Sequence, residues 1–304
     1  MQWNDLYQQF ELQLSEWYDK PEIQAIFYGI FEKYSGLNKI HFYTHRFEEI
    51  PTNSLPVYLS SLNSLTMGKP LQYILNDAPF YQLSFYVNSD VLIPRPETEE
   101  LVDWILQDLR MLNARDKNLH RMENDKELGL TLLDIGTGSG CIPISIKFHA
   151  EKIGVKVQAH GIDISENVLK VAQLNATNLN TELTLKNLDI LNKDNWNDIP
   201  NFDIIVSNPP YISPSEAEAM HQNVLKYEPY IALFVPEESD PLIFYRLIAT
   251  LGLSHLKAKG YLYFEINPLF NVEMEKLLIQ LGYKNIECRN DMQGKPRMIR
   301  AQKY

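Results

Sequence analysis

Hydrophobic side chains recur every three or four residues along the first 70 positions, the spacing that places them on one face of an α-helix. One stripe consists of Trp3, Tyr7, Phe10, Leu14 and Trp17, and a second of Ile23, Ile26, Phe27, Ile30, Phe31 and Tyr34. Pro21 suits the first turn of the second helix, and Gly36 is a typical stop. A further helix is expected from Leu55 to Leu65. We therefore predict a small helical domain over residues 1–70, whose aromatic stripes form a core rather than a binding surface.

Short apolar runs with a different spacing follow in residues 71–95. They are Phe80-Tyr81, Leu83 to Val87 and Val91 to Ile93. The turn residues Asn88-Ser89-Asp90 separate the last two runs, so we expect a β-hairpin that links two domains. After Pro94-Arg95-Pro96, a helix is predicted from Glu97 to about Leu112, and the polar residues 113–128 are predicted to form an exposed connection or an extension of that helix.

From Leu130 onward, predicted strands alternate with predicted helices. The strands are Leu130–Ile135, Val157–Ile162, Leu183–Asn187, Phe202–Ser207 and Gly260–Ile266, and the helices fall near Cys141–Ala150, Glu166–Thr177, Asp240–Ala258 and Phe270–Leu281. Such alternation builds a parallel sheet with helices on both faces, a Rossmann-like doubly wound α/β fold. Lys284–Cys288 and Arg297–Ala301 are expected to finish the sheet as an antiparallel strand pair, so that residues 96–304 form the larger domain.

The composition is that of a folded globular protein. Of 304 residues, 45% are hydrophobic and 22% charged, which excludes an extended disordered chain. No apolar run approaches the roughly 18 residues of a membrane helix, and residues Met1 to Asp5 show no signal-peptide pattern. Two cysteines, Cys141 and Cys288, cannot form a disulfide scaffold, so a cytoplasmic location is expected. The net charge of −11 disfavours a protein that grips nucleic-acid phosphates.

A glycine-rich turn follows the first strand of the larger domain. Gly136-Thr137-Gly138-Ser139-Gly140 stands between Asp134-Ile135 and an apolar helix. Glycines let a ligand approach the backbone closely, and the start of a helix offers free N–H groups. The spacing is G-x-G-x-G rather than the dinucleotide pattern G-x-G-x-x-G. Asp134 is better placed to meet a cation than a pyrophosphate.

The second strand ends at Asp163, whose two carboxylate oxygens can accept hydrogen bonds from two ribose hydroxyls. Together with the glycine-rich turn, this acid suits a nucleoside that carries a zwitterionic tail and no phosphate. S-adenosylmethionine is such a molecule. We therefore predict S-adenosylmethionine as the cofactor, with a plain tight turn as the alternative explanation of the glycines.

Asn208-Pro209-Pro210-Tyr211 follows the fourth strand. The prolines cannot continue a central strand, and each restricts the residue before it, so a stiff loop with exposed carbonyl oxygens is expected. A planar –NH₂ group fits this loop. The Asn208 side-chain oxygen and the Pro209 carbonyl oxygen can accept its two hydrogens, and the Tyr211 ring can stack on its planar face. Such a loop aims the nitrogen at a sulfonium methyl group, unless it only caps the strand.

These residues resemble the HemK/PrmC family of protein-(glutamine-N5) methyltransferases, which modify peptide-chain release factors, and the resemblance covers nearly the whole chain. The pieces that carry it are Pro70-Leu71-Gln72-Tyr73-Ile74, Leu92-Ile93-Pro94-Arg95-Pro96-Glu97-Thr98-Glu99, Asp134-Ile135-Gly136-Thr137-Gly138-Ser139-Gly140, Ser207-Asn208-Pro209-Pro210-Tyr211-Ile212, Tyr227-Glu228-Pro229 and Asp291…Gly294…Arg297. The resemblance implies a class I S-adenosylmethionine-dependent methyltransferase domain behind a small helical substrate-recognition domain.

The resemblance also implies roles for individual residues. Those that would bind S-adenosylmethionine are Gly136, Thr137, Gly138, Ser139, Gly140, Asp163, Trp196 and Asn208. Those that would receive the glutamine side chain of a Gly-Gly-Gln loop and carry the catalysis are Asn208, Pro209, Pro210 and Tyr211. The expected partner is a class I peptide-chain release factor, with no direct contact to nucleic acid or membrane.

Two other functions stay open on the residues themselves. A nucleic-acid methyltransferase acting on adenine N6 or guanine N2 would also suit Asn208–Tyr211, because its target is a planar nitrogen with two hydrogens. Such an enzyme needs a basic track for the anionic polymer, and the charge of −3 over residues 1–70 does not favour one. A non-catalytic binding module is the third possibility, and the intact glycine-rich and Asn-Pro-Pro-Tyr loops speak against it.

Several other side chains invite a chemical role. Cys141, at the start of the cofactor helix, is expected to pack rather than react. His41 and His45 are four residues apart, but no third ligand accompanies them in the sequence, so no metal is expected. Asp189 follows the third strand, where contact with adenine and exposure in a loop are both open. Arg95 and Glu97 suit either the cofactor pocket or an ion pair at the domain junction.

Overall fold

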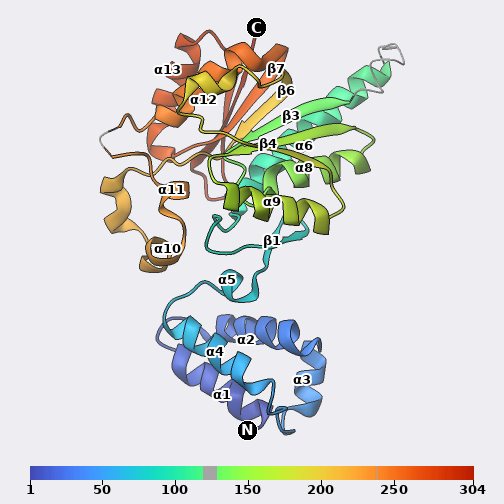
Figure 1. The fold of residues 1–304 in the computed structure, drawn as a ribbon, viewed down its shortest axis with the longest axis vertical. Helices are drawn as coiled ribbons and strands as arrows, with labels where there is room; N and C mark the ends of the chain where they lie inside the picture. Colours follow the sequence, from blue (N-terminus) through green and yellow to red (C-terminus); the bar gives the residue numbers. More distant parts are fainter. Residues whose placement is uncertain (119–128, 238) are drawn as a thin grey trace. The chain divides into compact units, whose positions relative to one another are not determined.

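The computed structural model describes residues 1–118, 129–237 and 239–304. The chain divides into two compact units (Figure 1). The first consists of Met1–Asp77 with Gln222–Tyr227, and the second of Ala78–His221 with Glu228–Tyr304. Each unit has a hydrophobic core of its own.

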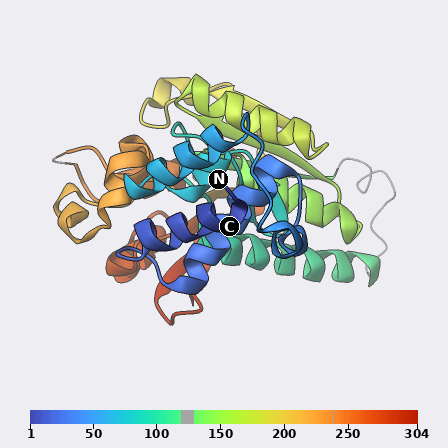
Figure 2. The same ribbon diagram turned by 90° about the horizontal axis from the view of Figure 1, so that it is seen from below.

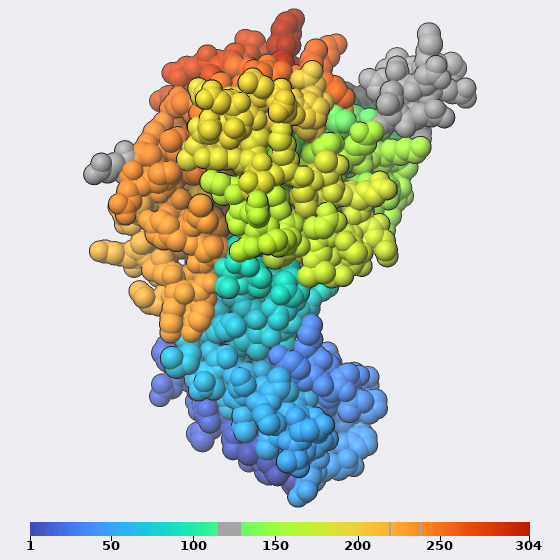
Figure 3. Space-filling view, viewed as in Figure 1, coloured from blue at the N-terminus to red at the C-terminus, as the bar shows by residue number. Residues whose placement is uncertain are grey.

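The first unit is a bundle of helices around an aromatic core. Its helices are α1 (Trp3–Leu14), α2 (Lys20–Ser35), α3 (Lys39–His45), α4 (Leu55–Thr66), α5 (Leu71–Leu75) and α10 (Gln222–Tyr227). Phe27 is fully buried and meets Phe10 edge to face, with ring centroids 5.2 Å apart, an arrangement that aromatic pairs prefer. In the space-filling view, residues 1–77 are coloured from dark blue to cyan (Figure 3). The helical character predicted for this region is confirmed.

Local signals set the ends of the first two helices. Asp19 caps α2 by accepting the backbone N–H of Glu22 at 2.9 Å, and Gly36 ends it with a φ of 70°. The hydrophobic stripe predicted for α1 includes Trp17, and this part of the prediction is wrong. The helix ends at Leu14 and the chain turns, because the N–H of Trp17 bonds the Leu14 carbonyl at 3.0 Å. The Trp17 side chain therefore leaves the buried face and is 66% exposed.

The hairpin at the start of the second unit lies earlier than the sequence indicated. β1 (Ala78–Phe80) pairs antiparallel with β2 (Leu83–Phe85), and Tyr81-Gln82 forms the turn with φ values of 44° and 63°. Two residues with positive φ make a tight hairpin turn, but such turns usually carry Asn or Gly, so this pair gave no turn signal. A turn is also present at Asn88–Asp90. Residues Val91–Ile93 after this turn are not a strand, so the strand predicted there is wrong.

Within the described residues, seven strands form the sheet of the second unit. They are β3 (Leu130–Ile135), β4 (Val157–Asp163), β5 (Leu183–Asn187), β6 (Phe202–Ser207), β7 (Leu256–Glu265), β8 (Lys284–Asn290) and β9 (Pro296–Gln302). Their order is β5-β4-β3-β6-β7-β9-β8, in which β3 to β7 are parallel and β9 is antiparallel to both of its neighbours. This topology confirms the predicted doubly wound sheet with a terminal antiparallel pair. The direction of winding reverses between β3 and β6, where open α/β sheets bind ligands.

Helices cover both faces of this sheet (Figures 1 and 2). One core contains residues of α6 (Pro96–Asn118), α8 (Cys141–Lys152) and α9 (Glu166–Asn178), and the other contains residues of α12 (Ile243–His255) and α13 (Asn271–Gln280). Neighbouring strand residues enter opposite cores, as Leu132 and Leu133 do, because side chains alternate along a strand. The shorter elements are η1 (Lys193–Trp196), η2 (Pro214–Ala219), α11 (Tyr230–Leu233) and η3 (Pro268–Phe270).

Helix α6 is longer than the sequence indicated and reaches Asn118. The predicted connection or helix extension at 113–128 is therefore helical over 113–118, and its remainder lies outside the described residues. No helix in the described part of the chain, α6 included, is long and apolar enough to cross a membrane.

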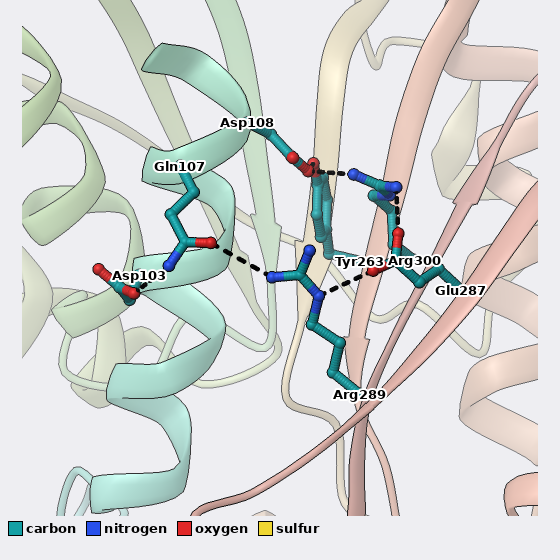
Figure 4. Close-up of polar contacts among 7 residues, drawn as sticks. All are labelled: Asp103, Gln107, Asp108, Tyr263, Glu287, Arg289 and Arg300. Carbon is teal, nitrogen blue, oxygen red and sulfur yellow. Dashed lines mark hydrogen bonds and ion pairs between the residues drawn. The ribbon is translucent and has the colours of Figure 1, made fainter. Parts of the chain in front are cut away.

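A chain of polar contacts fastens α6 to the antiparallel end of the sheet (Figure 4). The residues involved are Asp103, Gln107 and Asp108 on α6, Tyr263 on β7, Glu287 and Arg289 on β8, and Arg300 on β9. Asp108 accepts a hydrogen bond from the Tyr263 hydroxyl at 2.6 Å and forms an ion pair with Arg300. Arg300 also forms an ion pair with Glu287 at 2.5 Å. These contacts fix the position of the helix whose first turn reaches the site described below.

A buried asparagine on α9 joins three segments that are far apart in the sequence. Asn175 is 1% exposed, and its Oδ1 accepts the backbone N–H of Tyr86 at 2.7 Å. Its Nδ2 donates to the backbone oxygens of Tyr86 and Ser139, both at 2.9 Å. The side chain therefore ties the segment after β2 and the glycine-rich turn to α9.

Replacing Asn175 by Ala is expected to lower the free energy of unfolding by about 2 kcal/mol or more, because it leaves buried backbone groups without hydrogen-bond partners. Urea unfolding measures the loss. Asn178→Ala removes an exposed asparagine from the same helix and is expected to change stability by less than about 0.5 kcal/mol. Equal effects of the two substitutions would contradict the role assigned to Asn175.

Candidate functional site

A cavity of about 420 Å³ lies at the carboxyl ends of β3, β4 and β6. Ile135 and Gly136 line it from the end of β3, Asp163 from the end of β4, and Asn208 from the loop after β6. Its apolar walls include Val91, Leu92, Ile190, Tyr230, Ile231 and Phe234. A largely apolar cavity with a few polar groups at one end is typical of a small-molecule site.

The glycine-rich turn presents bare backbone to this cavity. Gly136 and Gly138 line it and have φ values of 73° and 55°, a conformation that glycine adopts without strain. A Cβ atom at either position would meet no described atom within 4 Å, so the space beside the backbone is open. Gly140 differs, because a Cβ there would lie 3.0 Å from the Ile144 side chain. The first two glycines therefore leave room for a ligand, whereas the third lets α8 pack.

Asp163 lies against this turn and is held by backbone N–H groups. Its Oδ2 accepts from Gly138 at 3.1 Å, and its Oδ1 accepts from Ser165 at 3.2 Å. Burial raises the pKa of Asp163, and these backbone hydrogen bonds oppose the rise. Each carboxylate oxygen has two lone pairs, so the residue can still accept hydrogen bonds from a ligand in the cavity.

Asp134 occupies a different environment from Asp163. It is 0% exposed and does not line the cavity, and neither of its carboxylate oxygens has a hydrogen-bond partner among the described residues. Burial raises its pKa to about 7, while the neighbouring Thr137 hydroxyl opposes the rise and the negative charge of Asp163 adds to it. The sequence suggested that Asp134 meets a cation directly. The structure does not place its side chain on the cavity wall, where such a contact would occur.

The Asn-Pro-Pro-Tyr loop leaves β6 next to the end of β3. The Ser207 hydroxyl donates to the carbonyl of Ile135 at 2.6 Å, which joins the ends of the two strands. Asn208, Pro209 and Pro210 line the cavity. The Asn208 Nδ2 donates to the Thr98 hydroxyl at 3.1 Å, and no described residue donates to its Oδ1. Asn208 thus keeps a free acceptor at the cavity.

Tyr211 does not line the cavity. Its hydroxyl donates to Glu265 Oε1 at 3.2 Å, and its ring packs against the core that contains α12. Burial, followed by the negative charge of Glu265, raises the pKa of Tyr211. These contacts hold the phenol protonated and fix the ring beside the end of β7.

Comparison with known proteins gives the site its context. A family model described as a methyltransferase domain matches residues 126–263. The release factor glutamine methyltransferase of Flavobacterium psychrophilum is 39% identical over 293 residues, which is 96% of each chain. The enzymes of the same name from Bacteroides thetaiotaomicron and Lactococcus lactis are 41% and 36% identical, over 78% and 92% of this chain and 77% and 93% of their own. The chain belongs to the release factor glutamine methyltransferase family. The resemblance seen in the sequence is confirmed.

The structure brings only part of the predicted cofactor set to the cavity. Gly136, Gly138, Asp163 and Asn208 line it, whereas Thr137, Ser139, Gly140 and Trp196 do not. Trp196 is 8% exposed, and its Nε1 donates to the carbonyl of Ile190 at 3.3 Å. Since Ile190 lines the cavity, Trp196 supports the wall from behind. Asp189, whose role stayed open in the sequence, also lines the cavity.

Sequence reasoning missed the apolar wall and the groups behind Asn208. Tyr230 and Ile231 on α11 line the cavity although both are more than half exposed; in the sequence they belong to a short apolar run without a motif. Thr98 and Glu265 approach Asn208 from 110 and 57 residues away along the chain. Periodicity along a sequence does not reveal such pairings.

Two further pieces of the family resemblance are ion pairs within the second unit. Arg95 bonds Glu228 Oε1 at 2.6 Å, while the other oxygen of Glu228 accepts the N–H of Ile93 at 3.3 Å. Arg297 donates to Asp291 at 3.2 Å. Of the two roles open for Arg95 in the sequence, the structure shows an ion pair, and neither Arg95 nor Glu97 lines the cavity.

The pKa of Asp134 predicts how its replacement depends on pH. The folded-state pKa of Asp134 is about 7, above the ordinary 3.8. The free energy of unfolding of the parent therefore falls as pH rises from about 4 through 7, because the buried carboxyl must then be kept neutral or become charged. Asn mimics the neutral form. The free energy of unfolding of Asp134→Asn minus that of the parent is therefore expected to be larger at pH 8.5 than at pH 5.5. Both proteins are unfolded in urea without ligand. A difference that does not change with pH, as expected for the control Asp198→Asn at an exposed site, would contradict this account.

Proposed function

We propose that this protein transfers the methyl group of S-adenosylmethionine to the side-chain nitrogen N5 of the glutamine in the Gly-Gly-Gln motif of class I peptide-chain release factors. One observation carries the proposal: a free acceptor oxygen of Asn208 and the stiff proline loop stand beside a glycine-rich turn in one cavity. The relatives that share nearly the full length of the chain bear the name of this activity.

The cofactor half of the cavity suits S-adenosylmethionine, which supplies a methyl group on a positively charged sulfur. The open space beside Gly136 and Gly138 admits a ligand against the backbone. Asp163 offers acceptor oxygens for ribose hydroxyls, and the apolar side chains of Leu188 and Ile190 line the wall beside Asp189. The cavity contains no Lys or Arg side chain among its described lining residues, which fits a ligand without phosphate.

The Asn208–Tyr211 loop orients the substrate nitrogen. The Asn208 Oδ1 and the Pro209 carbonyl oxygen accept the two amide hydrogens, which fixes the –NH₂ group and raises the electron density on a nitrogen whose lone pair is delocalised. Bound S-adenosylmethionine would supply its methyl group to this nitrogen, its sulfur would leave as a neutral thioether with the electron pair of the carbon–sulfur bond, and the extra proton of the nitrogen would leave to water. The loop therefore contributes orientation and electrostatics rather than a strong base. The stacking of the Tyr211 ring on the amide, expected from the sequence, gains no support from the cavity, because Tyr211 does not line it. Its hydroxyl is held by Glu265 at 3.2 Å.

The substrate class is tested with methyl-labelled S-adenosylmethionine. Label is expected in a release factor that carries Gly-Gly-Gln, and not in total tRNA, rRNA or DNA, because the cavity is built for an amide and the chain carries a net charge of −11. A release factor with Gly-Gly-Ala in place of the motif is the control and should remain unlabelled. Label confined to nucleic acid would instead support an exocyclic-amine methyltransferase.

Asn208→Ala is expected to lower turnover about 100-fold, the effect typical of removing one polar group that orients and polarises the reacting atoms. Cofactor binding, measured by calorimetry, should largely survive because the glycine-rich turn and Asp163 are unchanged. The exposed Asn178→Ala serves as the control for asparagine loss. Near-normal turnover of Asn208→Ala would remove the proposed role of the side-chain oxygen.

A further inference from the structure

Asn208 belongs to a hydrogen-bonded series that runs away from the cavity. Its Nδ2 donates to Thr98 Oγ1 at 3.1 Å, and Thr98 Oγ1 donates to Glu265 Oε2 at 2.6 Å. Thr98 lies in the first turn of α6 and is 3% exposed; Glu265 ends β7 and is 1% exposed. Neither residue lines the cavity. The series therefore reaches the site from behind, through Asn208 alone.

Counting protons fixes the direction of this series. The Thr98 hydroxyl donates its single proton to Glu265 Oε2 at 2.6 Å. The Thr98 oxygen then has only lone pairs left for Asn208. An amide can satisfy them only with its –NH₂ group, so the Asn208 Oδ1 is turned to the other side and stays free to accept.

Glu265 is placed to keep its role as acceptor. Its second oxygen, Oε1, receives the Tyr211 hydroxyl at 3.2 Å. Burial raises the pKa of Glu265, and the hydrogen bond from Thr98, the positive charge of Arg297 and the hydrogen bond from Tyr211 oppose this rise. Arg297 is itself held by Asp291 at 3.2 Å. A buried carboxylate with two donors and a nearby cation is compensated in the way that buried charges require.

We propose that Thr98, supported by Glu265, is a positioning residue that sets the orientation of the Asn208 amide and thereby presents an acceptor, not a donor, to the substrate –NH₂ group. The inference rests on the proposed function of Asn208. Without the hydroxyl of Thr98, the amide loses the partner that distinguishes its two ends. A rotated amide would place its own –NH₂ group against the –NH₂ group of the substrate, where two donors repel.

The competing explanation is that the Thr98–Glu265 hydrogen bond only fastens α6 to β7. In that case removing the hydroxyl would lower stability and leave turnover of the folded protein unchanged. The polar contacts of Asp108 with Tyr263 and Arg300 already join α6 to the same part of the sheet, so α6 has an anchor that does not involve Thr98.

The experiment compares Thr98→Val, which keeps the shape and loses the hydroxyl, with Thr98→Ser, which keeps the hydroxyl. Methylation of a Gly-Gly-Gln release factor is measured under saturating cofactor. We expect kcat of Thr98→Val to fall about 10- to 100-fold, by analogy with the loss of an outer hydrogen-bond partner that orients a metal ligand. We expect kcat of Thr98→Ser to stay within about threefold of the parent, and cofactor affinity by calorimetry to be unchanged in both.

Thr131→Val is the matched control. The Thr131 hydroxyl donates to the carboxylate of Asp203 at 2.8 Å and accepts the backbone N–H of Asp203 at 3.1 Å. It therefore has the same pattern of bonds as Thr98 but lies near the start of β3, away from the cavity. This variant should lose stability and keep its kcat. An equal fall in kcat for Thr131→Val and Thr98→Val would overturn the proposal.

A double substitution separates positioning from packing. If Thr98 acts through Asn208, adding Thr98→Val to Asn208→Ala should lower kcat by less than about twofold further, since coupled residues are not additive. Full additivity would overturn the proposal.

Should Thr98→Val fail to fold, Thr98→Ala replaces it, because it also lacks the hydroxyl and adds no bulk. The kcat of Thr98→Ala is then judged by the same criterion. An inactive parent and inactive Thr131→Val would refute the proposed function itself, whereas an active parent with a fully active Thr98→Val refutes only the positioning role.

Discussion

The parallel pairing of β3 with β6 is the constraint on which the site depends. Leu133 lies opposite Ile205 and Asp134 opposite Val206, so both strands end at the same edge of the sheet. The glycine-rich turn and the Asn-Pro-Pro-Tyr loop must then emerge side by side, although 72 residues separate the partners Ser207 and Ile135, whose hydrogen bond joins the two ends. Proximity of cofactor and substrate is thus a consequence of sheet register, before any side chain contributes chemistry.

Two buried carboxyl groups near this edge show how surroundings assign different roles to the same chemistry. Asp134 has no hydrogen-bond partner among the described residues, and burial raises its pKa to about 7. Glu265 is equally buried but receives two hydroxyl donors and the field of Arg297. A carboxylate with donors on both oxygens can impose a direction on its neighbours, whereas an unpaired one cannot. The orientation of Asn208 therefore traces back through Thr98 to Glu265, and not to Asp134.

Features encoded by neighbouring residues could be predicted from the sequence, and those encoded by distant contacts could not. The strands from Leu130 to Ser207 and the glycine-rich turn follow from local hydrophobic runs and glycine spacing, and the structure confirms them. The hairpin turn at Tyr81-Gln82 escaped because neither residue is a usual turn former. Trp196 and Tyr211 fell outside the cavity lining because hydrogen bonds to Ile190 and Glu265 hold their side chains elsewhere. Sequence spacing does not reveal such contacts.

The contacts behind Asn208 also give a physical reason for motif pieces that lie far from it in the sequence. The Pro-Arg-Pro-Glu-Thr stretch supplies Thr98 at the start of α6, where Pro96 suits the first helical position. The late Asp291…Gly294…Arg297 stretch forms a turn in which Asp291 holds Arg297 beside Glu265. Arg297 acts on Glu265 through its charge, Glu265 on Thr98 through a hydrogen bond, and Thr98 on the Asn208 amide through another. A cavity that must present only acceptors to a substrate –NH₂ group needs such a backing, because an asparagine side chain offers a donor and an acceptor of almost identical shape.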